Sequence, residues 1–421
     1  MKRLNNFIQL EKQNYSKSIR SFLPEYAVVP FIQSEKGNPE VLIKEGDTVR
    51  EGDVIAREDG TAVHAPLPGK VTRIAECTLP DGNPAQAAYI KLEGSFTFLG
   101  KKVHGSEWKS LDSKKIFHRI KEGGVINTFF HAQPLASQIE KCTLRKNRFL
   151  VIRLFDDDPV CETDKFLSMH FFREVVQGSL ATAAAMMAEG LVFIVPKKEA
   201  GRFKFERMEF PYAAVLADDS DYPSGKASSI IKAIRESTAP EAVRFKRING
   251  ESLLIDASTA LNVFYAVDYS LPVIEQFVHI TGNCLNAAAM FKARIGITAG
   301  ELAHQCGGFT KEPAKIIING FMNGYEVNTL DIPITKSVKS IAFLTKTELC
   351  NQSGSPCVRC GKCRAVCPED LYPDLLFSTQ RTDAVIKTAV LCTDCNLCNS
   401  VCPSRLPLSQ SISLLMEQNE L

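Results

Sequence analysis

The sequence predicts a multidomain protein that combines α/β and α+β modules with a C-terminal helical domain. The chain has 421 residues, more than one hydrophobic core usually organises. Its apolar pattern changes along the chain, from short β-branched runs to alternating strand-like and helix-like segments. Near its end, two groups of four cysteines repeat the same spacing. With 45% hydrophobic residues and a formal net charge of +2, the composition is globular and gives no reason to expect nucleic acid as a partner.

After an N-terminal segment at 1–28, residues 29–105 predict a compact all-β domain. The stretch "VLIKEGDTVREGDVIAREDGTAVHAPLPGKVTRI", residues 41–74, places Gly-Asp and Pro-Gly turn signals between short β-branched runs. The pattern resembles the barrel-sandwich hybrid of biotinyl and lipoyl domains, which carry a cofactor on a lysine at a hairpin tip. Segment 55–65 contains no lysine, so we expect a structural or docking role and no carrier role.

Two further domains are expected before the cysteine groups. In residues 106–270, the runs "FLVIRLF", "LVFIVP" and "YAAVLA" read as buried strands, and segments such as "SSIIKAIRES" read as helices. This alternation predicts an α/β layer with a parallel sheet. In residues 271–346, a strand, a turn, a short helix ending at Gly307-Gly308 and another strand predict a small α+β module.

No segment predicts a membrane span. The most apolar stretch, residues 179–196, is interrupted by Glu189 and Gly190 and reads as an Ala-rich helix followed by a buried strand. The N-terminus lacks the apolar run of a signal peptide, so we expect a reducing cytoplasm. Fourteen cysteines in that compartment favour metal binding over disulfides.

The two cysteine groups define the C-terminal domain, residues 347–421. "CVRCGKCRAVCP" and "CTDCNLCNSVCP" both have the spacing C-x2-C-x2-C-x3-C-P. In two-cluster ferredoxins with this spacing, three cysteines of one group bind one 4Fe-4S cluster and the fourth binds the other. A pair of zinc sites is the alternative, but zinc would not explain the third cysteine at x2 spacing in both groups. The predicted ligand sets are Cys357, Cys360, Cys363 and Cys402 for the first cluster, and Cys392, Cys395, Cys398 and Cys367 for the second.

The other cysteines are scattered along the chain and are expected to be small buried apolar residues. They are Cys77, Cys142, Cys161, Cys284, Cys306 and Cys350.

The order of these modules, with the motifs "CVRCGKCRAVCPEDLYPDLL", "CPSRLPLSQ", "ITGN" and "YPSG", resembles the C subunit of Rnf electron-transport complexes over nearly the whole chain. The cobalamin-reductase flavoprotein of propanediol utilisation is similar in architecture. The A subunit of the sodium-pumping NADH:quinone reductase is similar only in the earlier modules. The resemblance implies a Rossmann-like α/β layer, an SLBB-like module and a ferredoxin-like domain with two 4Fe-4S clusters. It also implies a peripheral protein at the cytoplasmic face of the inner membrane, bound to membrane subunits, which passes electrons from NADH through FMN to the clusters.

One part of the sequence departs from the family. The family's flavin and nucleotide loop reads G-x-G-G-A-x-F-P, whereas residues 127–134 read "NTFFHAQP". Phe129 and Phe130 replace the glycine pair whose amides would approach a phosphate, and phenylalanine resists positive φ. We expect both rings to be buried and to fill the phosphate position.

Two other segments of the same presumed site are also altered. The family's E-C-E-P stretch becomes three aspartates and a proline at 156–159, and G-E-K after "YPSG" becomes K-A-S. The resemblance therefore implies only a remnant flavin or nucleotide site, whose candidate residues are Asp156, Asp158, Tyr222 and Gly225.

Three functional hypotheses follow. The first is an electron-transfer subunit of a membrane-associated, ion-translocating complex that lacks a competent NADH/FMN site and is supplied by ferredoxin, flavodoxin or another subunit. The second is a complete NADH-oxidising FMN and iron–sulfur subunit. The third is a soluble flavoprotein of the cobalamin-reductase type. Bound FMN would distinguish the second, and co-purification with membrane subunits would distinguish the first from the third. Whether the chain catalyses a reaction of its own stays open.

Overall fold

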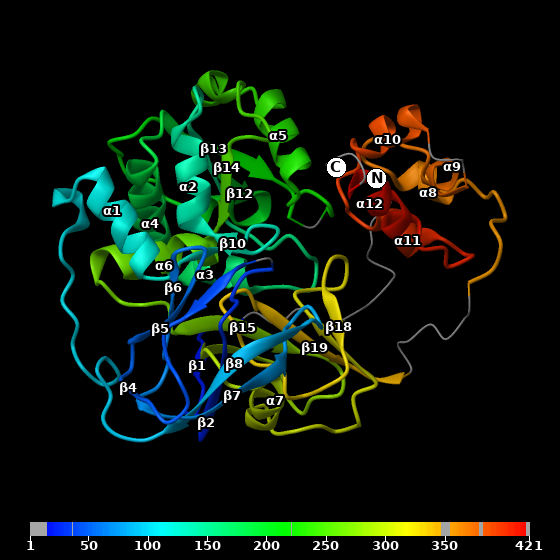
Figure 1. Ribbon diagram of the computed structural model, residues 1–421. Coiled ribbons are helices and arrows are strands. Elements are labelled where there is room, and N and C mark those ends of the chain that lie inside the picture. Colours follow the sequence, from blue (N-terminus) through cyan, green and yellow to red (C-terminus); the bar gives the residue numbers. More distant parts are fainter. Residues whose placement is uncertain (1–14, 36, 220, 347–353, 379–381, 418–421) are drawn as a thin grey trace.

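The computed structural model describes residues 15–35, 37–219, 221–346, 354–378 and 382–417. Three modules built around sheets lie side by side, and a helical module with the paired cysteines lies next to them (Figure 1). The α/β and α+β content predicted from the sequence is confirmed. The expected boundary at 346/347 lies outside the described residues.

The β-module near the N-terminus consists of two antiparallel sheets around one apolar core. The four-stranded sheet has the order β2-β8-β7-β4 and the three-stranded sheet the order β3-β5-β6. Val29, Ile55, Val71 and Ile90 are among its fully buried core residues. The all-β prediction is confirmed, although β2 begins three residues before the expected start at 29. The strands are β2 (Tyr26–Pro30), β3 (Pro39–Val41), β4 (Thr48–Val49), β5 (Val54–Glu58), β6 (Thr61–His64), β7 (Gly69–Thr78) and β8 (Pro84–Leu92).

The β5–β6 hairpin docks this module on the next one. Its turn residues Asp59 and Gly60 have φ values of 46° and 77°. Beside the turn, the Arg57 guanidinium donates to both carboxylate oxygens of Glu122, at 2.9 and 2.8 Å, at the end of α1 (Ser113–Glu122). A bidentate pair of this kind fixes orientation as well as distance. The hairpin is therefore fixed against α1 by this pair.

A buried lysine connects the same modules. The Lys336 ammonium donates to the carbonyl oxygens of Ala62, at 3.0 Å, and Gly124, at 2.7 Å. Gly124 has a φ of 71°, and a Cβ at this position would lie 2.2 Å from the Ala62 oxygen. Gly124 is therefore required for close packing of two modules. Burial lowers the pKa of Lys336 to about 7, although Glu58 partly opposes this shift.

We expect this lysine to make stability depend on pH. Between pH 7 and the ordinary lysine pKa of about 10.4, Lys336 is neutral in the folded chain and protonated in the unfolded chain. The unfolded state then binds more protons, so the free energy of unfolding should rise with pH, by up to about 1.4 kcal/mol per unit. Urea unfolding at several pH values tests this. Lys336→Met should flatten the slope, and Lys315→Met, at an exposed ion pair, should not.

The α/β module contains a parallel sheet with apolar cores on both faces, which confirms the predicted layer. The strand order is β13-β12-β11-β14, with parallel pairing throughout. Leu150 and Ile152 of β11 join the core that includes residues of α4 and α6, while Phe149 and Val151 join the opposite core under α5. The strands are β11 (Phe149–Arg153), β12 (Gly190–Pro196), β13 (Tyr212–Ala217) and β14 (Leu253–Asp256). The helices of this module after α1 are α2 (Leu135–Thr143), α3 (Thr163–His170), α4 (Phe172–Ala185), α5 (Ala227–Glu236) and α6 (Ala257–Asp268).

The apolar stretch 179–196 forms the end of α4 and all of β12, as interpreted from the sequence. Both elements are largely buried within this layer. Among the described residues, no helix combines the length and the apolar character needed to cross a membrane.

The α+β module has a mixed six-stranded sheet of order β1-β16-β15-β19-β17-β18. Its edge strand β1 comes from the N-terminal segment and pairs in parallel with β16. As expected, a short helix, α7 (Ala299–Gln305), ends just before Gly307 and Gly308, which have φ values of 86° and 77°. The strands are β1 (Ile19–Arg20), β15 (Glu275–Thr281), β16 (Ala289–Arg294), β17 (Lys315–Ile318), β18 (Tyr325–Val327) and β19 (Ser340–Leu344).

The cysteine module is helical. Leu371, Leu376, Ile412 and Leu415 form one of its small cores, which joins α9 to the C-terminal helix α12. The helices of this module are α8 (Lys362–Val366), α9 (Pro373–Ser378), α10 (Asp383–Ala389), α11 (Leu397–Val401) and α12 (Leu408–Glu417).

Candidate functional site

The eight cysteines of the two groups surround two small cavities of about 20 Å³ each. Each cavity is lined by three cysteines of one group and the fourth cysteine of the other group. The first cavity is lined by Cys357, Cys360, Cys363 and Cys402, and the second by Cys392, Cys395, Cys398 and Cys367. The chain thus brings together the same two sets that the spacing predicts as ligand sets.

The two groups share one backbone conformation. Arg359 and Gly361 of the first group have φ values of 50° and 72°. Asp394 and Asn396 stand at the same positions of the second group, with φ values of 48° and 58°. Each loop then enters a one-turn helix, α8 or α11, which carries the third cysteine. The repeat in sequence is therefore a repeat in structure.

Each cysteine set can be compared with the ligand set of a single metal ion. A tetrahedral zinc site with Zn–S bonds of about 2.3 Å would hold its sulfurs about 3.8 Å apart. In the part of the chain that the structure describes, no group of three or more His, Cys, Asp or Glu residues is arranged to hold one metal ion. Four thiols around a common cavity fit a polynuclear cluster better than a zinc ion.

The second cysteine group is held against two other modules. The Tyr222 hydroxyl donates to the Cys395 carbonyl oxygen at 2.8 Å, and the Tyr222 side chain is buried with Cys395 and Leu397. The Asn396 side-chain amide donates to the Met322 carbonyl oxygen at 2.7 Å. The loop is therefore positioned from both the α/β module and the α+β module.

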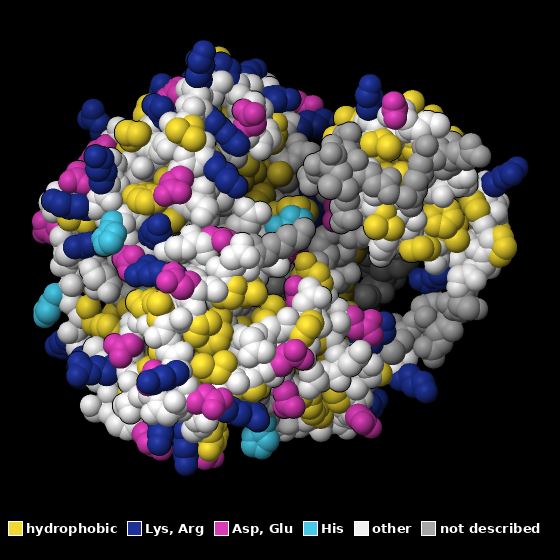
Figure 2. All heavy atoms as spheres, viewed as in Figure 1, with side chains coloured by type: hydrophobic (Ala, Val, Ile, Leu, Met, Phe, Trp, Pro, Cys, Tyr) yellow, Lys and Arg dark blue, Asp and Glu magenta, His cyan; other side chains and the backbone are white. Residues whose placement is uncertain are grey.

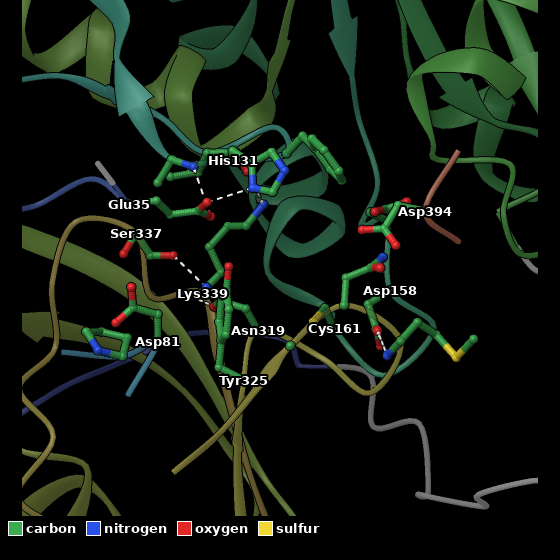
Figure 3. Close-up of a pocket in the computed structure, with 18 of the residues that line it drawn as sticks. Glu35, Asp81, His131, Asp158, Cys161, Asn319, Tyr325, Ser337, Lys339 and Asp394 are labelled. Carbon is green, nitrogen blue, oxygen red and sulfur yellow. Dashed lines mark hydrogen bonds and ion pairs between the residues drawn. The ribbon is translucent and has the colours of Figure 1, made fainter. Parts of the chain in front are cut away.

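A large cavity of about 800 Å³ lies where all four modules meet (Figure 3). Lys339, Asp158, Asp81 and Asp394 surround it, one from each module. Asn396 lines both this cavity and the second cysteine cavity, so the two spaces share a wall. The 127–134 loop forms another wall.

Several amides of this loop bond to the chain itself. The Thr128 amide donates to the Thr259 hydroxyl at 3.0 Å, and the Phe129 amide donates to the Asn127 side-chain oxygen at 3.1 Å. The Ala132 amide donates to a Glu35 carboxylate oxygen at 3.4 Å. A phosphate-binding loop needs uncovered amides and benefits from positive charge. These amides are occupied, and one faces a carboxylate, so this part of the loop does not fit a phosphate.

The two loop phenylalanines differ, and the expectation that both are buried is wrong for Phe130. Phe129 is 7% exposed and joins the core under the sheet, with the Arg153 guanidinium 4.3 Å from its ring centre. Phe130 is 46% exposed and lies at the cavity, with the Lys226 ammonium 4.7 Å from its ring centre. The sequence pattern could not separate them, because each ring's direction depends on tertiary contacts. The rings also leave the large cavity open.

The remnant-site candidates in segment 156–158 accept hydrogen bonds from backbone amides of the chain. Asp156 accepts from the amides of Asp164 and Lys165, both at 3.0 Å, at the start of α3. Asp158 accepts from the Met322 amide at 2.6 Å and the Val160 amide at 3.1 Å. Burial raises the pKa of Asp156 to about 7 and that of Asp158 to about 6.

The other two remnant-site candidates also contact the chain itself. The Gly225 carbonyl oxygen accepts from the Arg153 guanidinium at 2.8 Å. Tyr222 contacts the second cysteine group instead of the large cavity. Asp156 and Asp158 also line the large cavity, whereas Tyr222 and Gly225 do not.

A buried charge network beside the cavity was not predicted. The Lys339 ammonium lies 2.8 Å from the carboxylates of Asp164 and Asp256. Arg153 lies 3.9 Å from Asp164. Although burial opposes the charged form, the two aspartates raise the pKa of Lys339 above its ordinary value. A signal was present in the sequence, since Arg153, the last residue of β11, interrupts the apolar run "FLVIRLF".

Replacing Lys339 by methionine should destabilise the fold strongly. The change removes the ammonium that lies 2.8 Å from two fully buried carboxylates and leaves only Arg153, 3.9 Å from Asp164, and breaking a buried pair in this way typically costs about 3–5 kcal/mol. Urea unfolding monitored by circular dichroism measures the loss. Lys315→Met, which removes an exposed pair with Glu326, should cost under about 1 kcal/mol. Equal costs for the two variants would contradict the assigned role of the network.

The expectation of burial for the remaining cysteines holds only in part. Cys161 is partly exposed and lines the large cavity, with its sulfur 2.9 Å from the Ser340 hydroxyl. Cys77 is also partly exposed, on β7. Cys142, Cys284 and Cys306 are buried as expected, and Cys350 lies outside the described residues.

Comparison with known proteins shows which proteins this chain is similar to. Residues 9–95 match the family model "RnfC Barrel sandwich hybrid domain". The two-sheet β-module is therefore a barrel-sandwich hybrid, as predicted. Most of the chain is similar to the C subunits of ion-translocating oxidoreductase complexes, so the predicted resemblance to Rnf C subunits is confirmed.

Three relatives, all C subunits of their complexes, illustrate this similarity. The C subunit from Clostridium ljungdahlii, part of a proton-translocating ferredoxin:NAD(+) oxidoreductase complex, is 25% identical over 84% of this chain and 78% of the relative. The C subunit from Acetobacterium woodii, part of a Na(+)-translocating ferredoxin:NAD(+) oxidoreductase complex, is 24% identical over 83% of this chain and 80% of the relative. The C subunit from Rhodobacter capsulatus, part of an ion-translocating oxidoreductase complex, is 24% identical over 83% of this chain and 69% of the relative. Among solved structures, an NAD+-reducing [NiFe]-hydrogenase chain aligns with a TM-score of 0.43 at 13% identity, over 55% of this chain and 47% of that chain.

Proposed function

We propose that this protein is an electron-transfer subunit of a membrane-associated, Rnf-like, ion-translocating oxidoreductase complex and holds two 4Fe-4S clusters. The observation that carries the proposal is the crossed arrangement of the cysteines, three from one group and one from the other around each cavity. This is the ligation pattern of two-cluster ferredoxins. Relatives over most of the chain length are subunits of redox complexes, which supports the same assignment.

The chain's residues have distinct roles in this proposal. Cys357, Cys360 and Cys363, with Cys402, would hold the first cluster. Cys367 would complete the second set, and the Tyr222 hydroxyl would position the loop of that set through its bond to a backbone carbonyl. When bound, such clusters accept and donate single electrons.

The finer fold assignments belong to the same proposal. The parallel sheet with cores on both faces supports a Rossmann-like layer at residues 106–270. The mixed sheet with α7 supports an SLBB-like module at 271–346, and the helical module supports a ferredoxin-like domain at 347–421. The proposed barrel-sandwich hybrid covers residues 29–105, extended by the start of β2 at Tyr26, and the N-terminal segment 1–28 precedes it.

We further propose that the chain has no competent NADH/FMN site, so electrons come from a donor such as ferredoxin or flavodoxin or from another subunit. The occupied amides of the 127–134 loop support this. So do the internal contacts of Asp156, Asp158 and Gly225.

One observation favours the second hypothesis, a complete NADH-oxidising subunit. The open cavity next to the second cysteine set is large enough for a cofactor-sized ligand. Nothing in the described contacts favours the cobalamin-reductase type over the other two.

The partners proposed are the membrane subunits of an Rnf-like complex. The chain would bind them as a peripheral protein at the cytoplasmic face of the inner membrane. Its resemblance to C subunits of multi-subunit complexes supports this location.

Iron and sulfide analysis of anaerobically purified protein tests the proposal. Two complete ligand sets predict about eight iron and about eight sulfide per chain, with both centres reduced by dithionite. Membrane subunits should co-purify from the native source. Zinc in place of iron, or about half the expected iron, would overturn the cluster assignment.

A further inference from the structure

The two cysteine sets differ in their access to solvent. Cys357 and Cys360 of the first set are exposed. In the second set, Cys395 and Cys398 are buried, and their loop is covered by contacts to Tyr222 and Met322. A protein partner that approaches the described surface therefore comes closest to the first set.

An apolar and basic surface surrounds the first set. We call it the outer patch and define it by Val358, Arg359, Lys362, Tyr372 and Leu375. Val358 is 65% exposed, Tyr372 52% and Leu375 48%, which is unusual for large apolar side chains. Figure 2 shows hydrophobic side chains gathered over the outer side of this module, near α8 and α9.

The charge of the outer patch has one sign. Arg359 and Lys362 are exposed and make no ion pair with any residue that the structure describes. Arg405, which follows Cys402 in the chain, is likewise exposed and free of ion pairs with described residues. The acidic residue that lines this cavity, Asp374, is neutralised by a bidentate pair with Arg364 at 2.7 and 2.6 Å.

We propose that the outer patch is the docking surface for a one-electron carrier protein whose own redox centre is surrounded by acidic residues. This inference rests on the proposed function, because it needs a cluster at the first cysteine set. The outer patch combines exposed apolar side chains with cations, and its tyrosine and arginine are residue types that are enriched at protein interfaces. The unpaired cations would attract and orient an acidic partner.

The exchange at this surface is a single-electron step. A reduced carrier loses one electron and the first cluster gains it, with no bond made or broken and no proton required. The second set then lies between this entry point and the large cavity, since Asn396 lines both the second set and that cavity. The buried side of the second set accordingly faces the interior of the chain.

The test uses the full chain with its iron content verified, and flavodoxin as the acidic carrier. Calorimetry measures the dissociation constant with oxidised flavodoxin, and stopped-flow absorbance measures the rate of electron transfer from reduced flavodoxin. Cytochrome c serves as a basic carrier for comparison. Because Arg359 and Lys362 lie between ligand cysteines, the double variant R359Q/K362Q is paired with Arg405→Gln, which lies outside both cysteine groups. Lys387→Gln is the matched control, since Lys387 is exposed on α10 and lines neither cysteine cavity.

We expect R359Q/K362Q to weaken flavodoxin binding about tenfold and to slow electron transfer by a similar factor, and Arg405→Gln to have a smaller effect in the same direction. Lys387→Gln should behave as wild type, and added salt should weaken wild-type binding. Salt-independent binding, equal effects of the patch and control variants, or equal affinity for cytochrome c would overturn the inference. Missing iron–sulfur centres would overturn the proposed function as well, whereas intact centres with charge-independent binding would overturn only the docking surface.

Discussion

Replacing Cys402 by alanine is expected to remove the cluster of the first cysteine group and to spare the cluster of its own group. Cys402 lines the same cavity as Cys357, Cys360 and Cys363, although it belongs to the second cysteine group. Its counterpart in the first group, Cys367, lies 35 positions earlier in the chain. With only three thiols left, the first site loses one of the four ligands that such a cluster needs. Iron content should fall from about eight to about four per chain.

The reciprocal variant provides the control. Cys367→Ala should remove the second cluster, because Cys367 lines the cavity of Cys392, Cys395 and Cys398. The two losses are distinguishable by electron paramagnetic resonance, since the first set has two exposed cysteines, whereas the second has none and its loop is covered by Tyr222. A fast-relaxing water-soluble paramagnet should broaden the signal that remains in Cys367→Ala more than the signal that remains in Cys402→Ala. The opposite pattern would reject the crossed ligation.

The sequence was most informative where a local pattern determines a local structure. The apolar run of β11 is a central strand of the parallel sheet, and residues 179–196 form a helix end and a strand as interpreted. The cysteine spacing predicted which four residues meet at each cavity. Each x2 loop is short, so its three thiols must lie close together, and the two-cluster ferredoxin pattern supplied the fourth cysteine from the other group.

Features that depend on distant segments were not predictable in the same way. Strand β1 is only two residues long, and its partner β16 lies about 270 positions away, so no local sequence pattern predicts this pairing. Lys339 meets Asp164 and Asp256 across 175 and 83 positions. Phe129 and Phe130 are neighbours in sequence and both line the large cavity, yet Phe129 is buried in a core and Phe130 is exposed. In each case, tertiary packing decides the outcome.

The purified protein is expected to contain no flavin and to show no reduction of its clusters by NADH, while dithionite reduces both. The loop that would bind a flavin phosphate uses the amides of Thr128, Phe129 and Ala132 for internal hydrogen bonds. A phosphate would have to displace these bonds beside the Glu35 carboxylate, which repels it. Stoichiometric FMN in the native protein, or rapid reduction by NADH, would instead establish the complete NADH-oxidising subunit.

A direct comparison of FMN with riboflavin isolates the phosphate contribution. The two molecules share the ring system and differ in the phosphate, so the ratio of their dissociation constants measures what the loop offers to that group. Hydrogen bonds to a charged group are worth about 1.5–3 kcal/mol each, so even one hydrogen bond from the loop to the phosphate should favour FMN by about tenfold or more. We expect a ratio near one, because the amides of Thr128, Phe129 and Ala132 are already bonded and the Glu35 carboxylate beside the loop repels a phosphate. Replacing Phe130 by glycine should enlarge the cavity without changing this ratio, since the ring supplies no donor and its removal frees none of the three amides. Tighter binding of FMN than of riboflavin by tenfold in the wild type would show that the loop binds phosphate in another geometry.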